Sequence, residues 1–296
     1  MALFRLIRLP NLFIVVITLS LLYYRVLLPP FYRYQITPLF DNLHFWIFTG
    51  ITLLITASGY VINDLTDLRA DLYNKPGRVV VGKKISIQTA YWLYFCFCLV
   101  GYTISLYLAF YAGQVALINI YILAVGGLYY YSTRLKKLPL LGNLLVAVYC
   151  AGVAGMLWFA EREACALLYQ RSPEEAFHIQ MVLLTYMLFA FISTLFREIV
   201  KDLEDIPGDS AEKYRTMAVS WGLTASKRIA IAVGVILAVS IISSAIWLLP
   251  GFIALLALPV IYALYKLNRA QSSQDFAYIS QLAKAIMLGG LFILLL

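Results

Sequence analysis

Apolar residues follow one another along this chain in runs of about 20 positions, the length that a helix needs to cross a bilayer. The polar positions that recur on the exposed face of a soluble helix are missing from these runs. Nine runs qualify: 10–29, 43–62, 87–110, 114–132, 139–160, 178–197, 227–248, 251–267 and 277–296. They occupy most of the chain, so the pattern predicts an all-α integral membrane bundle of nine transmembrane helices, folded as one domain over residues 1–296.

Composition excludes an ordinary water-soluble protein. Hydrophobic residues make up 62% of the 296 positions and charged residues only 13%, whereas soluble domains carry about 25% charged residues. The four cysteines lie mostly inside apolar runs, which favours reduced thiols over a disulfide framework. A net charge of +8 is also typical of nucleic-acid-binding proteins. In so apolar a chain it indicates basic loops on one membrane face instead, and we expect no nucleic-acid partner.

Lysine and arginine are divided unequally between the two sets of connecting segments. With the N-terminus in the cytoplasm, 18 of the 23 basic residues fall on the cytoplasmic side, 4 fall outside, and Lys284 falls within the last run. Cytoplasmic loops of membrane proteins carry such an excess of positive charge. We therefore expect a multi-pass protein of the cell membrane, with its N-terminus and the long segments 63–86 and 198–226 on the cytoplasmic side.

Each of these two long segments opens with an acidic motif. Aspartates recur at i, i+3 and i+7 in both, as Asp64, Asp67 and Asp71 and again as Asp202, Asp205 and Asp209. A helix turns about 100° per residue, so the three positions share one face if the preceding helix continues. Glu198 adds a carboxylate one turn before the second motif. Pro207 and Gly208 argue against a helix that continues as far as Asp209.

Six carboxylates at the mouth of a bundle repel one another, and each costs about 2.5–3.5 kcal/mol if it is carried to mid-membrane. We therefore expect a compensating cation. Mg²⁺ fits because it takes hard oxygen ligands and bridges carboxylates to substrate phosphates. Basic residues near the motifs would balance a bound diphosphate: Lys75, Arg78, Arg134, Lys136, Arg197 and Lys201. A solvated loop with random acids is disfavoured because the motif occurs twice, each time at the end of a predicted helix.

These features resemble the UbiA superfamily of membrane prenyltransferases over essentially the whole chain. The resemblance rests on the nine runs, on Asn63-Asp64-x-x-Asp67-x-x-x-Asp71 after the second run, and on the Asp-rich motif after the sixth. It implies Mg²⁺-dependent transfer of a prenyl group from a prenyl diphosphate to a lipid or aromatic acceptor. Residues 1–296 would then form a single membrane prenyltransferase domain.

The resemblance also implies roles for individual residues. The expected metal ligands are Asn63, Asp64, Asp67, Asp71, Glu198, Asp202, Asp205 and Asp209, and the six aspartates are the expected catalytic residues. The expected substrate contacts are Asn11, Asn63, Lys75, Arg78, Tyr131, Arg134, Lys136, Asn143, Arg197 and Lys201. The element from Tyr131 to Lys136 is one residue longer than the common family form, so Arg134 and Lys136 are alternatives for one basic contact.

Within the superfamily, the second motif and Leu141-Gly142-Asn143 are most similar to the branch that adds a geranylgeranyl group to geranylgeranylglyceryl phosphate. The alternative acceptor is an aromatic quinone precursor of the 4-hydroxybenzoate or dihydroxynaphthoate type. A function of another class is ion-coupled transport, because acidic residues inside membranes also mark ion paths. The position of both motifs on one side favours headgroup chemistry over a path through the membrane.

Overall fold

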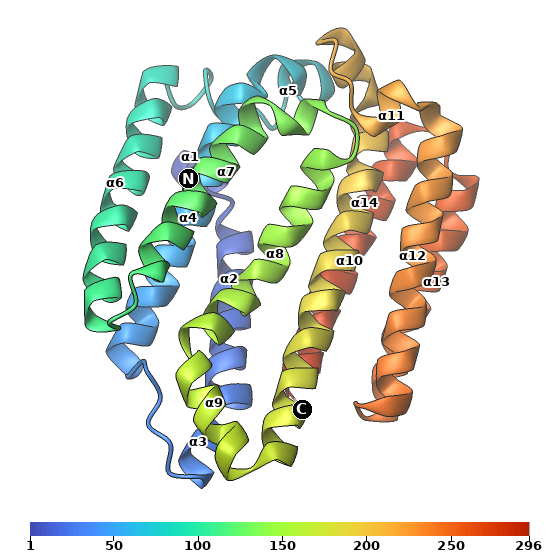
Figure 1. The fold of residues 1–296 in the computed structure, drawn as a ribbon. Helices are drawn as coiled ribbons and strands as arrows, with labels where there is room; N and C mark the ends of the chain where they lie inside the picture. Colours follow the sequence, from blue (N-terminus) through green and yellow to red (C-terminus); the bar gives the residue numbers. More distant parts are fainter. Residues whose placement is uncertain (296) are drawn as a thin grey trace.

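The structure of the protein is a computed structural model that describes residues 1–295, and it consists of helices joined by short segments (Figure 1). Nine helical segments are long and apolar enough to cross a membrane: Leu9–Arg33, Asn42–Thr66, Ile87–Tyr111, Ala116–Lys137, Leu141–Ala160, Pro173–Ala211, Gly222–Trp247, Gly251–Arg269 and Ser273–Leu295. The predicted number is therefore confirmed for the described part of the chain. The end of the ninth run, at position 296, lies outside the described residues.

Three of the nine segments are composite. The first joins α2 (Leu9–Leu21), a π-helical turn η1 (Leu22–Leu27) and α3 (Leu28–Arg33). The eighth joins η3 (Gly251–Leu256) to α13 (Ala257–Arg269), and the ninth joins α14 (Ser273–Gly289) to η4 (Gly290–Leu295). The other elements, in chain order, are α1 (Ala2–Leu6), α4 (Asn42–Thr66), α5 (Leu68–Asn74), α6 (Ile87–Tyr111), α7 (Ala116–Thr133), η2 (Leu135–Lys137), α8 (Leu141–Ala160), α9 (Arg162–Arg171), α10 (Pro173–Ala211), α11 (Met217–Ser220) and α12 (Gly222–Trp247).

Helix α10 forms the centre of the bundle. It packs against α8, α12 and α14. Of its most apolar stretch, 56% is buried inside the bundle, whereas the buried share is 17% for the peripheral segment that contains α7. Helices α4, α6 and α7 pack together on one side of α8 and α10, and α12, α13 and α14 pack together on the other (Figure 1). The second acidic motif therefore belongs to the central helix, and the first belongs to helices that lie beside it.

Short polar residues set the starts of several helices, because their side chains satisfy backbone N–H groups that have no partner inside the helix. The carboxylate of Asp41 accepts the N–H of His44 at the start of α4, and the hydroxyl of Ser86 accepts the N–H of Thr89 at the start of α6. Helix α14 begins with a full capping box that Ser272 forms with the third residue of the helix.

Helix α10 is longer than a membrane crossing requires. Its 39 residues extend over roughly 60 Å at 1.5 Å per residue, about twice the thickness of the hydrocarbon core. The end that bears α5 and α11, at the top of Figure 1, is called the motif end below. The expectation that Pro207 and Gly208 stop the helix was wrong, since α10 continues to Ala211 and carries the whole second motif. The predicted segment 198–226 is therefore helical over its first half.

Candidate active site

The first acidic motif spans a break between two helices. Helix α4 ends at Thr66, and Asp67 (φ −92°, ψ 1°) joins it to α5. The hydroxyl of Thr66 donates to the carbonyl of Asn63 at 3.0 Å, and the N–H of Asp67 donates to the same carbonyl at 2.9 Å. Such side-chain bonds to the backbone compete with the regular helix ladder. The break places Asp64 on one helix and Asp71 on another, and both line the same cavity.

The second motif lies on one continuous helix, and a side chain of α5 bonds to the backbone of this helix beside its proline. Pro207 has no N–H to donate, and the N–H of the next residue, Gly208, donates to Oδ1 of Asn74 at 2.8 Å. The amide nitrogen of Asn74 donates to the carbonyl of Asp205 at 3.2 Å. A Cβ at position 208 would lie 2.3 Å from this amide nitrogen, so the position needs a glycine. Asn74, the last residue of α5, thereby fastens the first acidic segment to the second.

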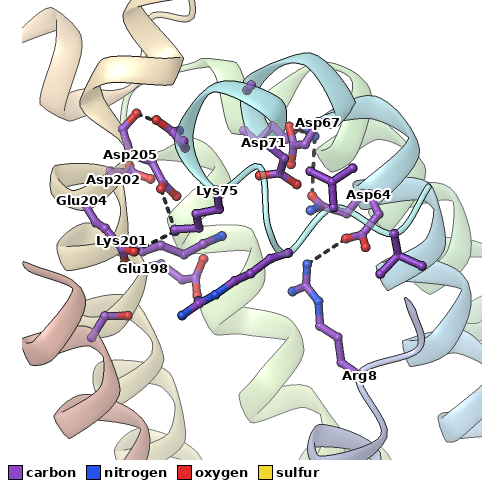
Figure 2. A pocket seen from close by; sticks show the side chains of 18 of the residues that line it. Arg8, Asp64, Asp67, Asp71, Lys75, Glu198, Lys201, Asp202, Glu204 and Asp205 are labelled. Carbon is purple, nitrogen blue, oxygen red and sulfur yellow. Dashed lines mark hydrogen bonds and ion pairs between the residues drawn. The ribbon is translucent and has the colours of Figure 1, made fainter. Parts of the chain in front are cut away.

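A polar cavity of about 980 Å³ lies between the two motifs. In Figure 2 the carboxylates of the first motif form one wall, those of α10 form the opposite wall, and Lys75 extends across the space between them. Of the seventeen predicted site residues, sixteen line this cavity: Asn11, Asn63, Asp64, Asp67, Asp71, Lys75, Arg78, Tyr131, Lys136, Asn143, Arg197, Glu198, Lys201, Asp202, Asp205 and Asp209. Arg134 does not, because its side chain is exposed at the end of α7.

Basic residues offset part of this acidic charge. The ion pairs are Arg8–Asp64 (2.9 Å), Lys136–Asp67 (2.6 Å), Lys75–Glu204 (2.8 Å), Lys75–Asp205 (2.8 Å) and Arg197–Glu198. Sequence reasoning assigned no site role to Arg8 or Glu204. Arg8 stands three positions before the predicted contact Asn11, and Glu204 stands inside the second motif, so proximity to predicted site residues was the signal for both.

Of the two alternatives Arg134 and Lys136, only Lys136 lines the cavity, and the start of α8 lies close to its backbone. A Cβ on Gly142 would lie 2.7 Å from the Cα of Lys136, so only a glycine lets α8 pack this tightly against η2. Lys136 extends into the cavity, where its ammonium also donates to the hydroxyl of Thr66 at 2.7 Å. The neighbouring Asn143 donates its amide N–H to the carboxylate of Asp202 at 2.9 Å.

Three carboxylates of the motifs, Asp71, Asp202 and Asp209, take part in none of the ion pairs formed within residues 1–295. Burial, together with repulsion by Asp67 and against an opposing effect of Lys201, raises the pKa of the Asp71 carboxyl from 3.8 to about 6. Loss of hydration and a neighbouring negative charge both disfavour the ionised form of a carboxyl. Bringing a cation into the cavity would relieve this repulsion.

The donor set suits Mg²⁺. Within residues 1–295 no three His, Cys, Asp or Glu side chains are spaced to enclose an ion. Mg²⁺ does not need such a cage, because it is usually held by one or two carboxylates together with water and substrate phosphates. Hard carboxylate and amide oxygens are available on both walls.

An apolar cavity of about 510 Å³ continues from the polar one between α2, α4, α7 and α8. Its wall is made largely of aliphatic and aromatic side chains, among them Phe48, Leu117 and Met156. Eight residues line both cavities and form what we call the throat: Arg8, Asn11, Asn63, Tyr131, Arg197, Glu198, Lys201 and Lys284. A charged compartment and an apolar compartment thereby lie next to each other and share part of their walls.

Solved structures share this fold. A structure from work on digeranylgeranylglyceryl phosphate synthase in membranes gives a TM-score of 0.66 at 23% identity and covers 99% of this chain and 96% of that one. A UbiA homologue from Archaeoglobus fulgidus, bound to DMAPP and Mg²⁺, gives a TM-score of 0.54 at 15% identity, with 99% of each chain covered. At these identities the likeness shows the fold alone.

Sequence comparison extends the likeness. The digeranylgeranylglyceryl phosphate synthase of Saccharolobus solfataricus is 37% identical over 180 residues, which cover 60% of this chain and 56% of that relative. This match therefore spans little more than half of the relative's length. The enzyme of the same name from Sulfolobus acidocaldarius is 33% identical over 230 residues, 75% of each chain. The model of the UbiA prenyltransferase family matches residues 12–286. The chain therefore belongs to the UbiA prenyltransferase family.

Proposed function

We propose that this protein transfers a geranylgeranyl group from geranylgeranyl diphosphate to geranylgeranylglyceryl phosphate, in a reaction that depends on Mg²⁺. The junction of the two cavities carries this proposal. The acidic motifs face a polar space of about 980 Å³, which opens into an apolar space of about 510 Å³. A prenyl diphosphate is divided in the same way, into an anionic head and a long apolar chain.

In this proposal the two motif walls hold the diphosphate head. The residues that would hold Mg²⁺ are Asn63, Asp64, Asp67, Asp71, Glu198, Asp202, Asp205 and Asp209. Mg²⁺ when bound supplies Lewis-acid stabilisation of the negative charge on the leaving group. Lys75, Arg78 and Lys201 line the same space and add fixed positive charge toward the diphosphate. The homologue from Archaeoglobus fulgidus is bound to DMAPP and Mg²⁺, which supports the use of Mg²⁺ with a prenyl diphosphate.

The transfer itself replaces one carbon–oxygen bond by another. A hydroxyl oxygen of the acceptor forms a bond to C1 of the prenyl group while the C1–O bond to the diphosphate breaks. The electron pair of the broken bond leaves with the diphosphate, and the hydroxyl proton is released into the polar cavity. Tyr131 of the throat and Tyr60 both line the apolar cavity, where their ring faces can stabilise positive charge developing at C1. The apolar wall excludes water, which would otherwise trap this carbon.

We also propose that the motif end faces the cytoplasm. The distribution of basic residues supports this orientation, because 18 of 23 fall on the side that carries the motifs. The exposed Arg134 lies at the motif end and the exposed Glu174 at the opposite end, so single cysteines at these positions report the orientation. In intact cells a membrane-impermeant maleimide should label position 174 and leave position 134 unlabelled. The reverse pattern would contradict the orientation.

The activity is tested with purified protein, Mg²⁺ and geranylgeranyl diphosphate. Geranylgeranylglyceryl phosphate, 4-hydroxybenzoate and dihydroxynaphthoate are offered separately, and the products are identified by mass spectrometry. We expect alkylation of the lipid acceptor, and no product when EDTA replaces Mg²⁺. Alkylation of an aromatic acceptor instead would reassign the acceptor and retain prenyl transfer. The absence of product with all three acceptors would contradict the proposal.

A further inference from the structure

Lys284 is a lysine of the throat for which the acidic motifs provide no ion pair. Its ammonium donates to Oδ1 of Asn11 at 2.7 Å, and the side chain lines both cavities. None of the ion pairs formed within residues 1–295 includes it. Arg8 and Arg197, which line the same throat, are also cationic. These two arginines already have carboxylate partners in Asp64 and Glu198, whereas Lys284 has none among the described residues, and a partly buried ammonium without an anion is costly.

The sign of the charge reverses between the polar cavity and the throat. Four basic residues of the throat, Arg8, Arg197, Lys201 and Lys284, stand against one acidic residue, Glu198. The aspartates of both motifs line the polar cavity and none of them lines the apolar one. The space between the motifs therefore attracts cations, and the throat beneath it attracts an anion.

One face of α14 lines the polar cavity from Ala277 to Lys284, where the cavity meets the throat. Ala277, Ser280, Gln281 and Lys284 follow the i, i+3, i+4, i+7 spacing of a single helix face, and all four line the polar cavity. Residues from the start of the chain line the same cavity, among them Arg5. The groups available on this side are hydroxyl, amide, ammonium and guanidinium, which are the donors that bind phosphate.

We propose that Lys284 binds the phosphate monoester of the lipid acceptor and thereby selects phosphorylated acceptors over neutral ones. This inference rests on the proposed function. The donor's diphosphate is accounted for by Mg²⁺, the motif carboxylates and Lys75, so the second anion of the reaction needs a separate place. A lysine without a carboxylate partner serves this purpose, because its charge is available to the phosphate without first breaking an ion pair.

The test compares Lys284→Gln with Lys284→Arg and with Lys266→Gln, an exposed lysine on α13 that lines neither cavity. Steady-state kinetics are measured with geranylgeranylglyceryl phosphate and with geranylgeranylglycerol, which lacks the phosphate. Lys284→Gln should raise KM for the phosphorylated acceptor about ten- to a hundredfold, the size expected for a lost charge-assisted hydrogen bond. The preference for the phosphorylated acceptor should fall by the same factor. Lys284→Arg should keep most of this preference, and Lys266→Gln should keep all of it.

Two kinetic outcomes would overturn the inference. An equal loss on both acceptors would show that Lys284 serves only to hold Asn11. A raised KM for geranylgeranyl diphosphate with an unchanged acceptor preference would show that Lys284 binds the donor instead. If the wild-type protein alkylates no acceptor, the proposed function fails, and the subsite is then tested by binding alone.

The binding test uses hexadecyl phosphate, hexadecanol and inorganic phosphate with the full-length protein in detergent and EDTA. The wild-type protein should bind hexadecyl phosphate more tightly than either of the other two, because the chain enters the apolar cavity and the headgroup meets Lys284. Lys284→Gln should lose this advantage over hexadecanol. Equal affinity of the wild-type and Lys284→Gln proteins for hexadecyl phosphate would overturn the subsite. Binding of inorganic phosphate as tight as that of hexadecyl phosphate would show a simple anion site.

Discussion

The two acidic motifs have the same spacing of aspartates but differ in the conformation of their backbone. The first is divided at Asp67 between α4 and α5, while the second runs unbroken along α10 through a proline. A motif without proline is broken and a motif with proline is continuous, which is the opposite of what local helix propensity predicts. The difference lies in a partner: the side chain of Asn74 bonds to the backbone on both sides of Pro207, at the carbonyl of Asp205 and the N–H of Gly208.

The motifs also differ in how their charge is offset. In the first motif, Asp64 and Asp67 are paired with Arg8 and Lys136, which come from other parts of the chain. In the second, Asp205 is paired with Lys75, the residue that follows α5. Each half of the site is therefore completed by residues outside it. The motifs form one site because the end of α5, with Asn74 and Lys75, packs against α10.

The largest expected effect comes from removing one carboxylate of each motif. Asp67→Ala and Asp202→Ala should each lower kcat by about a hundredfold or more, as expected when fixed electrostatic stabilisation of the transition state is lost. Product formation is measured by mass spectrometry, and size-exclusion chromatography in detergent confirms that each variant remains folded. Glu174→Ala, an exposed acidic residue at the opposite end, is the matched control and should be unaffected. Near-wild-type turnover in either aspartate variant would contradict its role.

The next largest effect is expected when the hydrogen bond between the Gly208 N–H and the Asn74 side chain, which joins the two motifs, is removed. Asn74→Ala leaves the N–H of Gly208 without its partner and should cost about 1–3 kcal/mol of stability. Gly208→Ala places a methyl group against Asn74 and should cost about the same through overpacking. The double variant should be less destabilised than the sum of the two, because removing the Asn74 amide makes room for the methyl group.

Thermal unfolding in detergent measures this cycle. Gly126→Ala is its control, since a Cβ at that position in α7 meets nothing within 4 Å. It should be neutral, or more stable by about 0.5–1 kcal/mol through helix propensity. Strict additivity of Asn74→Ala and Gly208→Ala would contradict the coupling between the two motifs.

A smaller effect is expected from pH. Because the pKa of Asp71 is raised to about 6, its carboxyl is protonated below that pH in the metal-free protein, and a proton then competes with Mg²⁺. The Mg²⁺ concentration needed for half-maximal activity should rise, by up to about tenfold per pH unit, as the pH falls below 6, since metal ligands must be deprotonated. Asp71→Asn removes the titrating group and should flatten this dependence. A wild-type profile that is flat between pH 5 and pH 7 would contradict the assignment.

The smallest expected effect distinguishes two neighbouring basic residues beside the first motif. Arg134→Ala should change turnover by less than about twofold, as is usual for exposed side chains. Lys136→Ala, which removes the ion pair to Asp67, should reduce turnover more strongly under the same conditions. Equal losses in both variants would show that Arg134 also reaches the substrate.

The cavity residues could be predicted from sequence to the extent that they lie close to the motifs along the chain. Asn63, Lys75 and Arg78 flank the first motif, and all three line the polar cavity. Arg8 was missed as a site residue because its partner Asp64 is 56 positions away, and no local pattern reports a pair of that separation. The choice between Arg134 and Lys136 also stayed open, because it depends on how closely α8 approaches η2 at Gly142.

The sequence by itself determined the nine membrane segments and the position of the acidic motifs at helix ends. Membrane insertion follows from the summed transfer free energy of about 20 neighbouring residues, which is a local property of the chain. The tertiary structure decided that α10 continues past Pro207, that Lys136 faces the cavity, and that Lys284 meets Asn11. Hydrogen bonds, ion pairs and glycine contacts act over a few ångströms between segments far apart in sequence, so only the packed bundle specifies them.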